Sequence, residues 1–244
     1  MQETLRRNSN KNCRARHQAM RYVALLAGTL ALTASLHIKA QGTATTSVVK
    51  LTVPIQRIEN HERRNFIENC SAYAVKKTAQ HYVFLSSWHC IDGLYDRLNL
   101  PKITHADTTI SPTFGESGGN MDEDWLILRT PSDVFGDSLT LAYPASEEVQ
   151  KGETLYGFGW GGRLQNPAST PKELTCLALD VGRKLTLNCG FAKGDSGGLV
   201  ARKVKGRYEA VGIISAGDSS TITYAYPLSA LPQRLLKALS EDGN

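Results

Sequence analysis

The sequence lacks an apolar run long enough to span a membrane comfortably. Its longest run covers the fifteen residues 22–36, whereas a transmembrane helix needs about 20. A basic segment precedes this run, and a small residue, Ala40, follows it. These features together are typical of a secretory signal peptide. We therefore predict a signal peptide over residues 1–40, with Met20 as an alternative start and an uncleaved membrane anchor as the alternative interpretation.

Beyond this segment the chain lacks an excess of either charge. Residues 1–40 hold seven of the 28 Lys and Arg but one of the 23 Asp and Glu, so residues 41–244 have a net charge of −1. Proteins that bind nucleic acid usually present strongly basic surfaces. We therefore expect no nucleic-acid partner and, once the signal peptide is removed, no stable membrane association.

Cysteine is scarce, and its few copies are informative. One of the five, Cys13, lies in the predicted signal peptide, and four remain: Cys70, Cys90, Cys176 and Cys189. An even number of cysteines in an exported chain favours disulfides. Three pairings exist, and the simplest is local, with each bridge contributing about 3 kcal/mol. Zinc is the alternative, but there is no C-x-x-C spacing and no histidine near the last two cysteines. We predict no metal and no cofactor.

Extended helical patterns are also scarce. The apolar runs after residue 46 are short, rich in β-branched and aromatic residues, and separated by turn signals such as GDS, WGGR and KGR. This pattern predicts an all-β fold, either a barrel or a sandwich. Four leucines near the C-terminus share one face of a predicted helix: Leu231, Leu235, Leu236 and Leu239. The polar stretch 131–138 is a candidate connection between two β halves, so we predict domains over 41–135 and 136–244.

No histidine follows His105. This absence matters for the segment GDSGG at 194–198, in which Ser196 stands among glycines. The letters satisfy G-x-S-x-G, the nucleophile elbow of α/β-hydrolases, but those enzymes place the catalytic histidine after the serine. The elbow is therefore excluded. A base for Ser196 must come from upstream, since a serine nucleophile needs a base within hydrogen-bond reach.

His89 is the predicted base. It stands at the end of the apolar run HYVFLSS and directly before Cys90, so a strand end and a disulfide would hold it rigidly. A lone histidine is more often an ordinary surface or packing residue. We interpret His61, His81 and His105 in that way.

Asp124 is the predicted acid that orients the imidazole. It opens DWLIL, an apolar strand pattern, so its carboxylate would lie at the mouth of a buried strand. Asp122 and Glu123 are close rivals, and all three residues could equally form a solvated acidic turn. We choose Asp124 because it directly adjoins the apolar run.

Three motifs in this order resemble those of chymotrypsin-like (trypsin-like) serine proteases: WHC, DWLIL and GDSGGL. The usual sequences of that family are AAHC or AGHC, D-I-A-L-L and GDSGGP. The resemblance extends from about Ser47 to Leu239, and the short loops look more like those of bacterial members. It implies two six-stranded antiparallel β-barrels, a C-terminal helix and a site in the crevice between the barrels. Cys70 and Cys90 match the family's bridge beside the catalytic histidine.

The resemblance implies a role for each residue of the site. His89 would act as general base and then general acid, Asp124 would orient it, and Ser196 would attack the scissile carbonyl. The N–H groups of Gly194 and Ser196 would form the oxyanion hole. Asp195 matches the buried acid that braces the oxyanion loop.

The resemblance also indicates where a substrate would lie. Ser215, Ala216 and Gly217 match the segment whose backbone pairs with the substrate strand. Trypsin-type pockets have an acid six residues before the serine, where this chain has Gly190, so cleavage after Lys or Arg is not favoured. Phe191 either fills part of the pocket, which would favour small or medium apolar side chains, or packs in the core.

One departure from the family concerns activation. No IVGG start precedes Cys70, and the dipeptide Arg57-Ile58 is only a weak candidate for an activation site. The resemblance therefore leaves open which group neutralises Asp195 and whether a propeptide is cleaved.

The predicted function is a serine endopeptidase that is secreted or periplasmic. A polypeptide substrate and a protein inhibitor are the expected partners, and we expect a monomer. Two alternatives remain: a protease-like binding module that has lost catalysis, and a secreted esterase that uses the same triad.

Overall fold

The computed structural model describes residues 44–95, 99–161, 170–217 and 221–240. All of them belong to one compact unit. The predicted signal peptide, residues 1–40, lies outside these ranges. Among the helices in the described ranges, none has both the length and the apolar character needed to cross a membrane.

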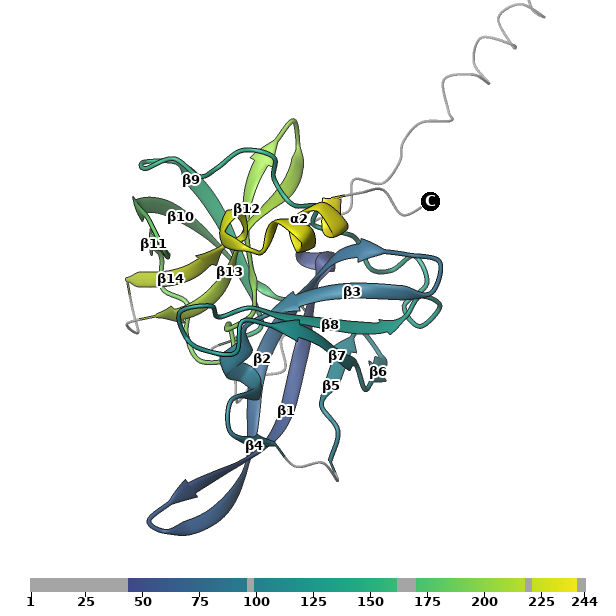
Figure 1. The fold of residues 1–244 in the computed structure, drawn as a ribbon. Coiled ribbons are helices and arrows are strands. Elements are labelled where there is room, and N and C mark those ends of the chain that lie inside the picture. The colour runs from purple at the N-terminus through teal and green to yellow at the C-terminus, as the bar shows by residue number, and fades with distance from the viewer. Residues whose placement is uncertain (1–43, 96–98, 162–169, 218–220, 241–244) are drawn as a thin grey trace, which may run out of the picture. The chain divides into compact units, whose positions relative to one another are not determined.

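The N-terminal half is a curled antiparallel sheet, whose strand order is β6-β5-β1-β2-β3-β8-β7, with β4 paired to β1 beside this path. Figure 1 shows the hairpin of β1 and β2 projecting well beyond the rest of this sheet. The strands are β1 (Val48–Glu59), β2 (Glu62–Lys77), β3 (His81–Ser86), β4 (Leu94–Tyr95), β5 (Lys102–His105), β6 (Thr108–Ile110), β7 (Thr113–Ser117) and β8 (Leu126–Pro131).

The C-terminal half is a closed barrel in the order β10-β11-β14-β13-β12-β9. Its strands are β9 (Thr154–Gly159), β10 (Lys172–Val181), β11 (Leu185–Asn188), β12 (Leu199–Val204), β13 (Arg207–Gly217) and β14 (Ile222–Pro227). The helical elements are the 3-10 turns η1 (Ala44–Ser47), η2 (Trp88–Ile91) and η3 (Leu228–Ala230), followed by the α-helix α2 (Gln233–Ser240).

This architecture confirms the predicted chymotrypsin-like double barrel with a C-terminal helix. The N-terminal half carries eight strands where six were expected, because the segment 94–110 contributes three short ones, β4, β5 and β6. The boundary predicted at residues 135 and 136 falls in the connection between β8 and β9. Phe135, in that connection, packs edge-on against Tyr82 and Phe84 of the N-terminal core.

Each half has its own apolar core, and a third cluster joins them. Tyr73 and Trp125 of the N-terminal half share this cluster with Phe158 of the C-terminal barrel, and Leu235 and Leu239 of α2 pack against it. The two leucines are four apart and therefore lie on one face of the helix, as their spacing predicts, but Leu231, predicted to share that face, precedes the helix and directly follows η3. Because burial of large side chains is a main source of stability, this cluster fixes the two halves against each other. The site described next therefore has a rigid frame.

Two disulfides complete the frame. Cys70 pairs with Cys90, which connects β2 to η2, and Cys176 pairs with Cys189, which connects β10 to the residue after β11. This is the local pairing expected from the sequence. The first bridge anchors the turn that carries His89.

Candidate active site

Strand pairing brings His89 and Asp124 together. β3 and β8 are antiparallel neighbours, and Ser86 at the end of β3 lies opposite Leu126 at the start of β8. His89 follows β3 by three residues, within η2, and Asp124 precedes β8 by two. The register of two buried strands is fixed by their side-chain pattern, so the same register sets the distance between these two side chains.

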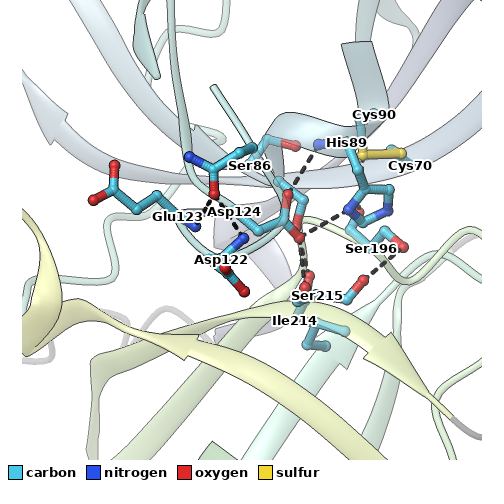
Figure 2. Close-up of polar contacts among 12 residues, drawn as sticks. Cys70, Ser86, His89, Cys90, Asp122, Glu123, Asp124, Ser196, Ile214 and Ser215 are labelled. Carbon is cyan, nitrogen blue, oxygen red and sulfur yellow. Dashed lines mark hydrogen bonds and ion pairs between the residues drawn. A yellow bond between two sulfur atoms is a disulfide. The ribbon is translucent and has the colours of Figure 1, made fainter. Parts of the chain in front are cut away.

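Asp124 is fully buried and makes three hydrogen bonds, two of them from His89. Its Oδ2 lies 2.8 Å from the imidazole Nδ1, and its Oδ1 accepts the backbone N–H of His89 at 2.9 Å. The hydroxyl of Ser215, from β13 of the other half, donates to Oδ2 at 2.5 Å (Figure 2). A carboxylate that accepts the Nδ1 hydrogen leaves Nε2 as the proton acceptor of a neutral imidazole. Such an imidazole can act as a general base.

These contacts govern the ionisation of Asp124. Burial alone would raise the pKa of its carboxyl, but the hydrogen bonds from His89 and Ser215 outweigh that cost and hold the pKa below its ordinary range. Hydrogen bonds to the charged form of an acid favour that form. Asp124 is therefore suited to remain an anion beside the imidazole.

The rivals of Asp124 lie elsewhere. Asp122 and Glu123 are exposed, and their backbone N–H groups donate to the side chain of Asn120 in a turn. Figure 2 shows the carboxylate of Glu123 pointing away from His89. Of the three acidic residues, Asp124 is the one in contact with the imidazole.

The other histidines stand apart from this arrangement. His61 occupies the turn of the β1–β2 hairpin, and His81 is the exposed first residue of β3. His105 ends β5, where its Nε2 lies 3.3 Å from the carbonyl oxygen of Ser138. The structure thus agrees with their interpretation as ordinary residues.

Ser196 lies on a tight glycine-containing loop between β11 and β12. Gly194 and Gly197 have positive φ values of 98° and 83°, a backbone conformation in which glycine is strongly favoured. Ser71 of β2 holds this loop, because its hydroxyl donates to the carbonyl of Gly194 at 2.9 Å and its N–H to the carbonyl of Ser196 at 2.7 Å. The backbone on both sides of the Ser196 N–H is therefore held from the N-terminal half.

The hydroxyl of Ser196 faces the same cavity as His89. Its Oγ donates to the carbonyl oxygen of Ser215 at 3.4 Å, a long hydrogen bond. In Figure 2 the side chain of Ser196 lies beside the imidazole, and both residues line one cavity. A serine hydroxyl rotates about its side-chain torsion, and catalytic hydrogen bonds often tighten only when substrate is bound. The structure thus brings a serine hydroxyl and an imidazole to one cavity.

The cavity has a volume of about 490 Å³. Its walls are mainly apolar and come from the loop before Ser196, from the end of β13 and from Met121: Phe191, Ala192, Lys193, Ile214, Ser215, Ala216, Gly217 and Met121. A larger cavity of about 630 Å³ lies on the N-terminal sheet beside Phe66 and Leu100, but the described residues that line it include no carboxylate and no histidine. The smaller cavity is therefore the candidate substrate site.

The structure separates the two predicted pocket residues. Phe191 is 2% exposed and belongs to the core of the C-terminal barrel, yet it also lines the cavity, so it serves as core and as pocket wall. Gly190 instead directs its carbonyl oxygen to the ammonium of Lys172 at 3.3 Å. Of these two residues, Phe191 therefore lines the pocket, with its phenyl ring as part of the wall.

Sequence reasoning missed two groups. The first is the hydroxyl of Ser215, expected only to contribute its backbone, which bonds Asp124. The second is Lys172, the first residue of β10, whose Nζ lies 2.7 Å from Oδ2 of the fully buried Asp195. No local pattern marks either contact, because each depends on how the elements pack in three dimensions.

The fold of this chain is similar to that of several serine proteases of known structure. No family model and no curated protein matches the sequence. Solved structures do match. A thermostable serine protease, AL20, from an extremophilic microorganism has a TM-score of 0.60 at 14% identity, with 81% of this chain and 99% of that chain covered.

Two further structures are similar to this chain. A serine endoprotease from Yersinia pestis has a TM-score of 0.57 at 16% identity, with 82% of this chain and 65% of that chain covered. The active form of the Rv3671c protease from M. tuberculosis has a TM-score of 0.53 at 15% identity, with coverages of 82% and 83%. At these identities the likeness shows the fold.

Proposed function

We propose that this protein is a serine endopeptidase that hydrolyses peptide bonds through Ser196, His89 and Asp124. The observation that carries the proposal is the hydrogen bond between His89 and the buried Asp124, together with the cavity that His89 and Ser196 both line. The three solved structures of similar fold are proteases, which supports the same class.

The proposed reaction has two stages, acylation of Ser196 and hydrolysis of the acyl-enzyme. Ser196 Oγ attacks the scissile carbonyl carbon while His89 Nε2 takes the hydroxyl proton, and the resulting oxyanion accepts hydrogen bonds from the N–H groups of Gly194 and Ser196. The C–N bond then breaks as His89 gives its proton to the leaving amine, which leaves an acyl-enzyme. In the second stage a water oxygen attacks the acyl carbon while His89 takes the water proton, the ester bond then breaks as His89 returns that proton to Ser196 Oγ, and the acid is released.

The substrate class follows from β13 and the cavity. Residues 215–217 lie at the end of β13, where Ala216 and Gly217 pair with β14 on one side, and β12 pairs with β13 only as far as Ile213 on the other. An extended peptide can pair with the backbone there, beside Ser196. A Cβ placed at Gly217 would lie 2.7 Å from the carbonyl oxygen of Phe191, so the walls approach each other closely. With Ile214 and Ala216 as further walls, we propose a preference for small or medium apolar side chains before the cleaved bond.

We further propose that the protein works outside the cytoplasm, either secreted or in the periplasm. The two disulfides support this location, because such bridges persist in oxidising compartments. The polar and apolar pattern of residues 1–40 supports export by a signal peptide.

Hydrolysis of an unstructured protein substrate tests the proposal. The purified protein should cleave it, a peptide library should show cuts after small or medium apolar residues, and the Ser196→Ala variant should be inactive. Turnover of esters without any turnover of peptides would instead favour the esterase. A wild-type protein that cleaves neither would favour the catalytically silent binding module.

A further inference from the structure

We propose that Lys172 is a positioning residue that holds the Ser196 loop in its active shape and makes activity independent of a newly cut amino terminus. The inference rests on the proposed function, because the loop it concerns would carry the nucleophile and the oxyanion donors.

The carboxylate of Asp195 is fully buried, and three donors contact it among the residues that the structure describes. Lys172 Nζ lies 2.7 Å from Oδ2, the N–H of Ala192 donates to Oδ2 at 2.8 Å, and the N–H of Gly161 donates to Oδ1 at 2.6 Å. A buried charge without compensation is strongly unfavourable. Lys172 is the donor that brings a positive charge, so the buried position of Asp195 depends on it.

Two glycines leave room for this carboxylate: Gly159, the last residue of β9, and Gly161, two residues further along the chain. A Cβ at Gly159 would lie 2.5 Å from Oδ1 of Asp195, and a Cβ at Gly161 would lie 2.5 Å from its Cγ. Any larger residue there would displace the carboxylate. The barrel therefore leaves a space of the right size directly beside the ammonium of Lys172.

Lys172 contacts both ends of the segment that precedes Ser196. Besides Asp195, its Nζ donates to the carbonyl of Gly190 at 3.3 Å and lies 4.7 Å from the centroid of the Phe191 ring, a favourable cation–π distance. One ammonium thus joins the start and the end of residues 190–195. It consequently fixes the peptide groups that lead into Gly194 and Ser196.

The contact with Lys172 accounts for the neutralisation of Asp195 without an IVGG start. The candidate activation dipeptide, Arg57-Ile58, lies within β1, where the two residues pair with Arg64 and Arg63 of β2. Cleavage there would cut a strand of the N-terminal sheet. Asp195 already has its cation from β10, so we expect activity without any cleavage that creates a new amino terminus.

A set of lysine variants tests the positioning role. Lys172→Met should lower kcat for peptide hydrolysis about 10²–10³-fold, the typical effect of losing an oxyanion donor. KM should change by less than about threefold, because the loss falls on the transition state. Lys172→Arg keeps the charge and should retain activity within about tenfold of the wild type. Lys203→Met is the matched control, since Lys203 also stacks on a ring, that of Tyr208 at 5.4 Å, in the same barrel.

A second measurement uses the full chain and remains decisive if Lys172→Met does not fold. The intact 244-residue chain, its mass verified, should react with a fluorophosphonate at Ser196 as fast as a form cut ahead of residue 44. Reaction only after cleavage would overturn the inference, and so would a wild-type kcat in Lys172→Met. If neither the cut nor the intact wild-type chain reacts or cleaves peptide, the proposed function itself falls and the inference falls with it.

Discussion

The two halves of the molecule each contribute one fully buried carboxylate to the site, and they stabilise it in different ways. Asp124, in the N-terminal half, accepts hydrogen bonds from His89 and from Ser215. Asp195, in the C-terminal half, faces the ammonium of Lys172. An imidazole gains and loses protons near neutral pH, so the first carboxylate can support proton transfer. The second, paired with a lysine, serves to shape a loop.

The difference extends to how each half is held. In the N-terminal half, neighbouring strands and the Cys70–Cys90 bridge bring the base and the acid together. In the C-terminal half, the loop of Ser196 depends on glycine turns and on the ion pair between Lys172 and Asp195. The comparison supports the proposed division, in which one half would supply the proton chemistry and the other would supply the nucleophile and the shape of the oxyanion hole.

The largest expected effect comes from removing a reacting group from either half. Ser196→Ala and His89→Ala should each reduce kcat by about 10⁶, and the double variant should be no worse than either one, because the residues act as a unit. Steady-state hydrolysis of a peptide substrate measures this. Additive losses in the double variant would show that the two residues do not work together.

The next effect sharpens the choice of acid. Asp124→Asn should preserve the fold and reduce kcat by about 10⁴, because the imidazole loses the anion that orients it and selects its tautomer. Asp122→Asn, in the adjacent exposed turn, is the matched control and should change kcat little. If the control were the damaging change and Asp124→Asn nearly silent, the assigned acid would be wrong while the enzyme class survived.

The two disulfides allow the halves to be compared directly. Replacing both cysteines of either bridge by serine should lower the free energy of unfolding by about 3 kcal/mol, as measured by urea denaturation. Loss of the Cys70–Cys90 bridge should also lower kcat, because it loosens His89. Loss of the Cys176–Cys189 bridge should act mainly on KM, because the chain runs directly from it into the pocket wall at Phe191. The reverse assignment of kcat and KM effects would contradict the division of roles.

The smallest effect concerns pH. The pKa of Asp124 is lowered in the folded state despite burial, so its ionisation contributes stability above the unfolded-state pKa, and that contribution is lost as pH falls through the folded pKa. Ser215→Ala removes one hydrogen bond to the anion. The loss of stability between about pH 7 and about pH 3 should therefore be smaller in this variant, by up to about 1 kcal/mol, because pH 3 is only about one unit below the ordinary pKa of an aspartate.

A matched serine variant controls for the general cost of removing a hydroxyl. Ser132→Ala removes a hydrogen bond to the neutral carbonyl of Ala79, so it should shift stability equally at both pH values. An equal shift in Ser215→Ala would mean that Ser215 does not stabilise the carboxylate.

The sequence predicts much of the N-terminal half of the site. His89 and Asp124 stand at strand ends, and the alternation and apolar runs that mark strands β3 and β8 are local patterns. The nucleophile loop is also readable, because its glycines are needed for the tight backbone at Gly194 and Gly197. These features depend on residues that are close in the sequence.

The remaining contacts could not be predicted because they depend on how distant elements pack. Lys172, at the start of β10, contacts Asp195 in the loop between β11 and β12, and the hydroxyl of Ser215 in one half contacts Asp124 in the other. A lysine at a strand start and a serine on a strand are common residues with no local mark of a role. The dual position of Phe191, in the core and on the cavity, likewise follows from barrel closure and from no pattern around it.

The most direct test of the central claim is covalent labelling with a fluorophosphonate followed by peptide mass spectrometry. The reagent reacts with a serine oxygen that a neighbouring base activates. We expect a single phosphonyl group on the peptide that contains Ser196 in the wild-type protein, with labelling abolished in Ser196→Ala and strongly slowed in His89→Ala. Labelling of another serine, or undiminished labelling of the Ser196→Ala protein, would contradict the account.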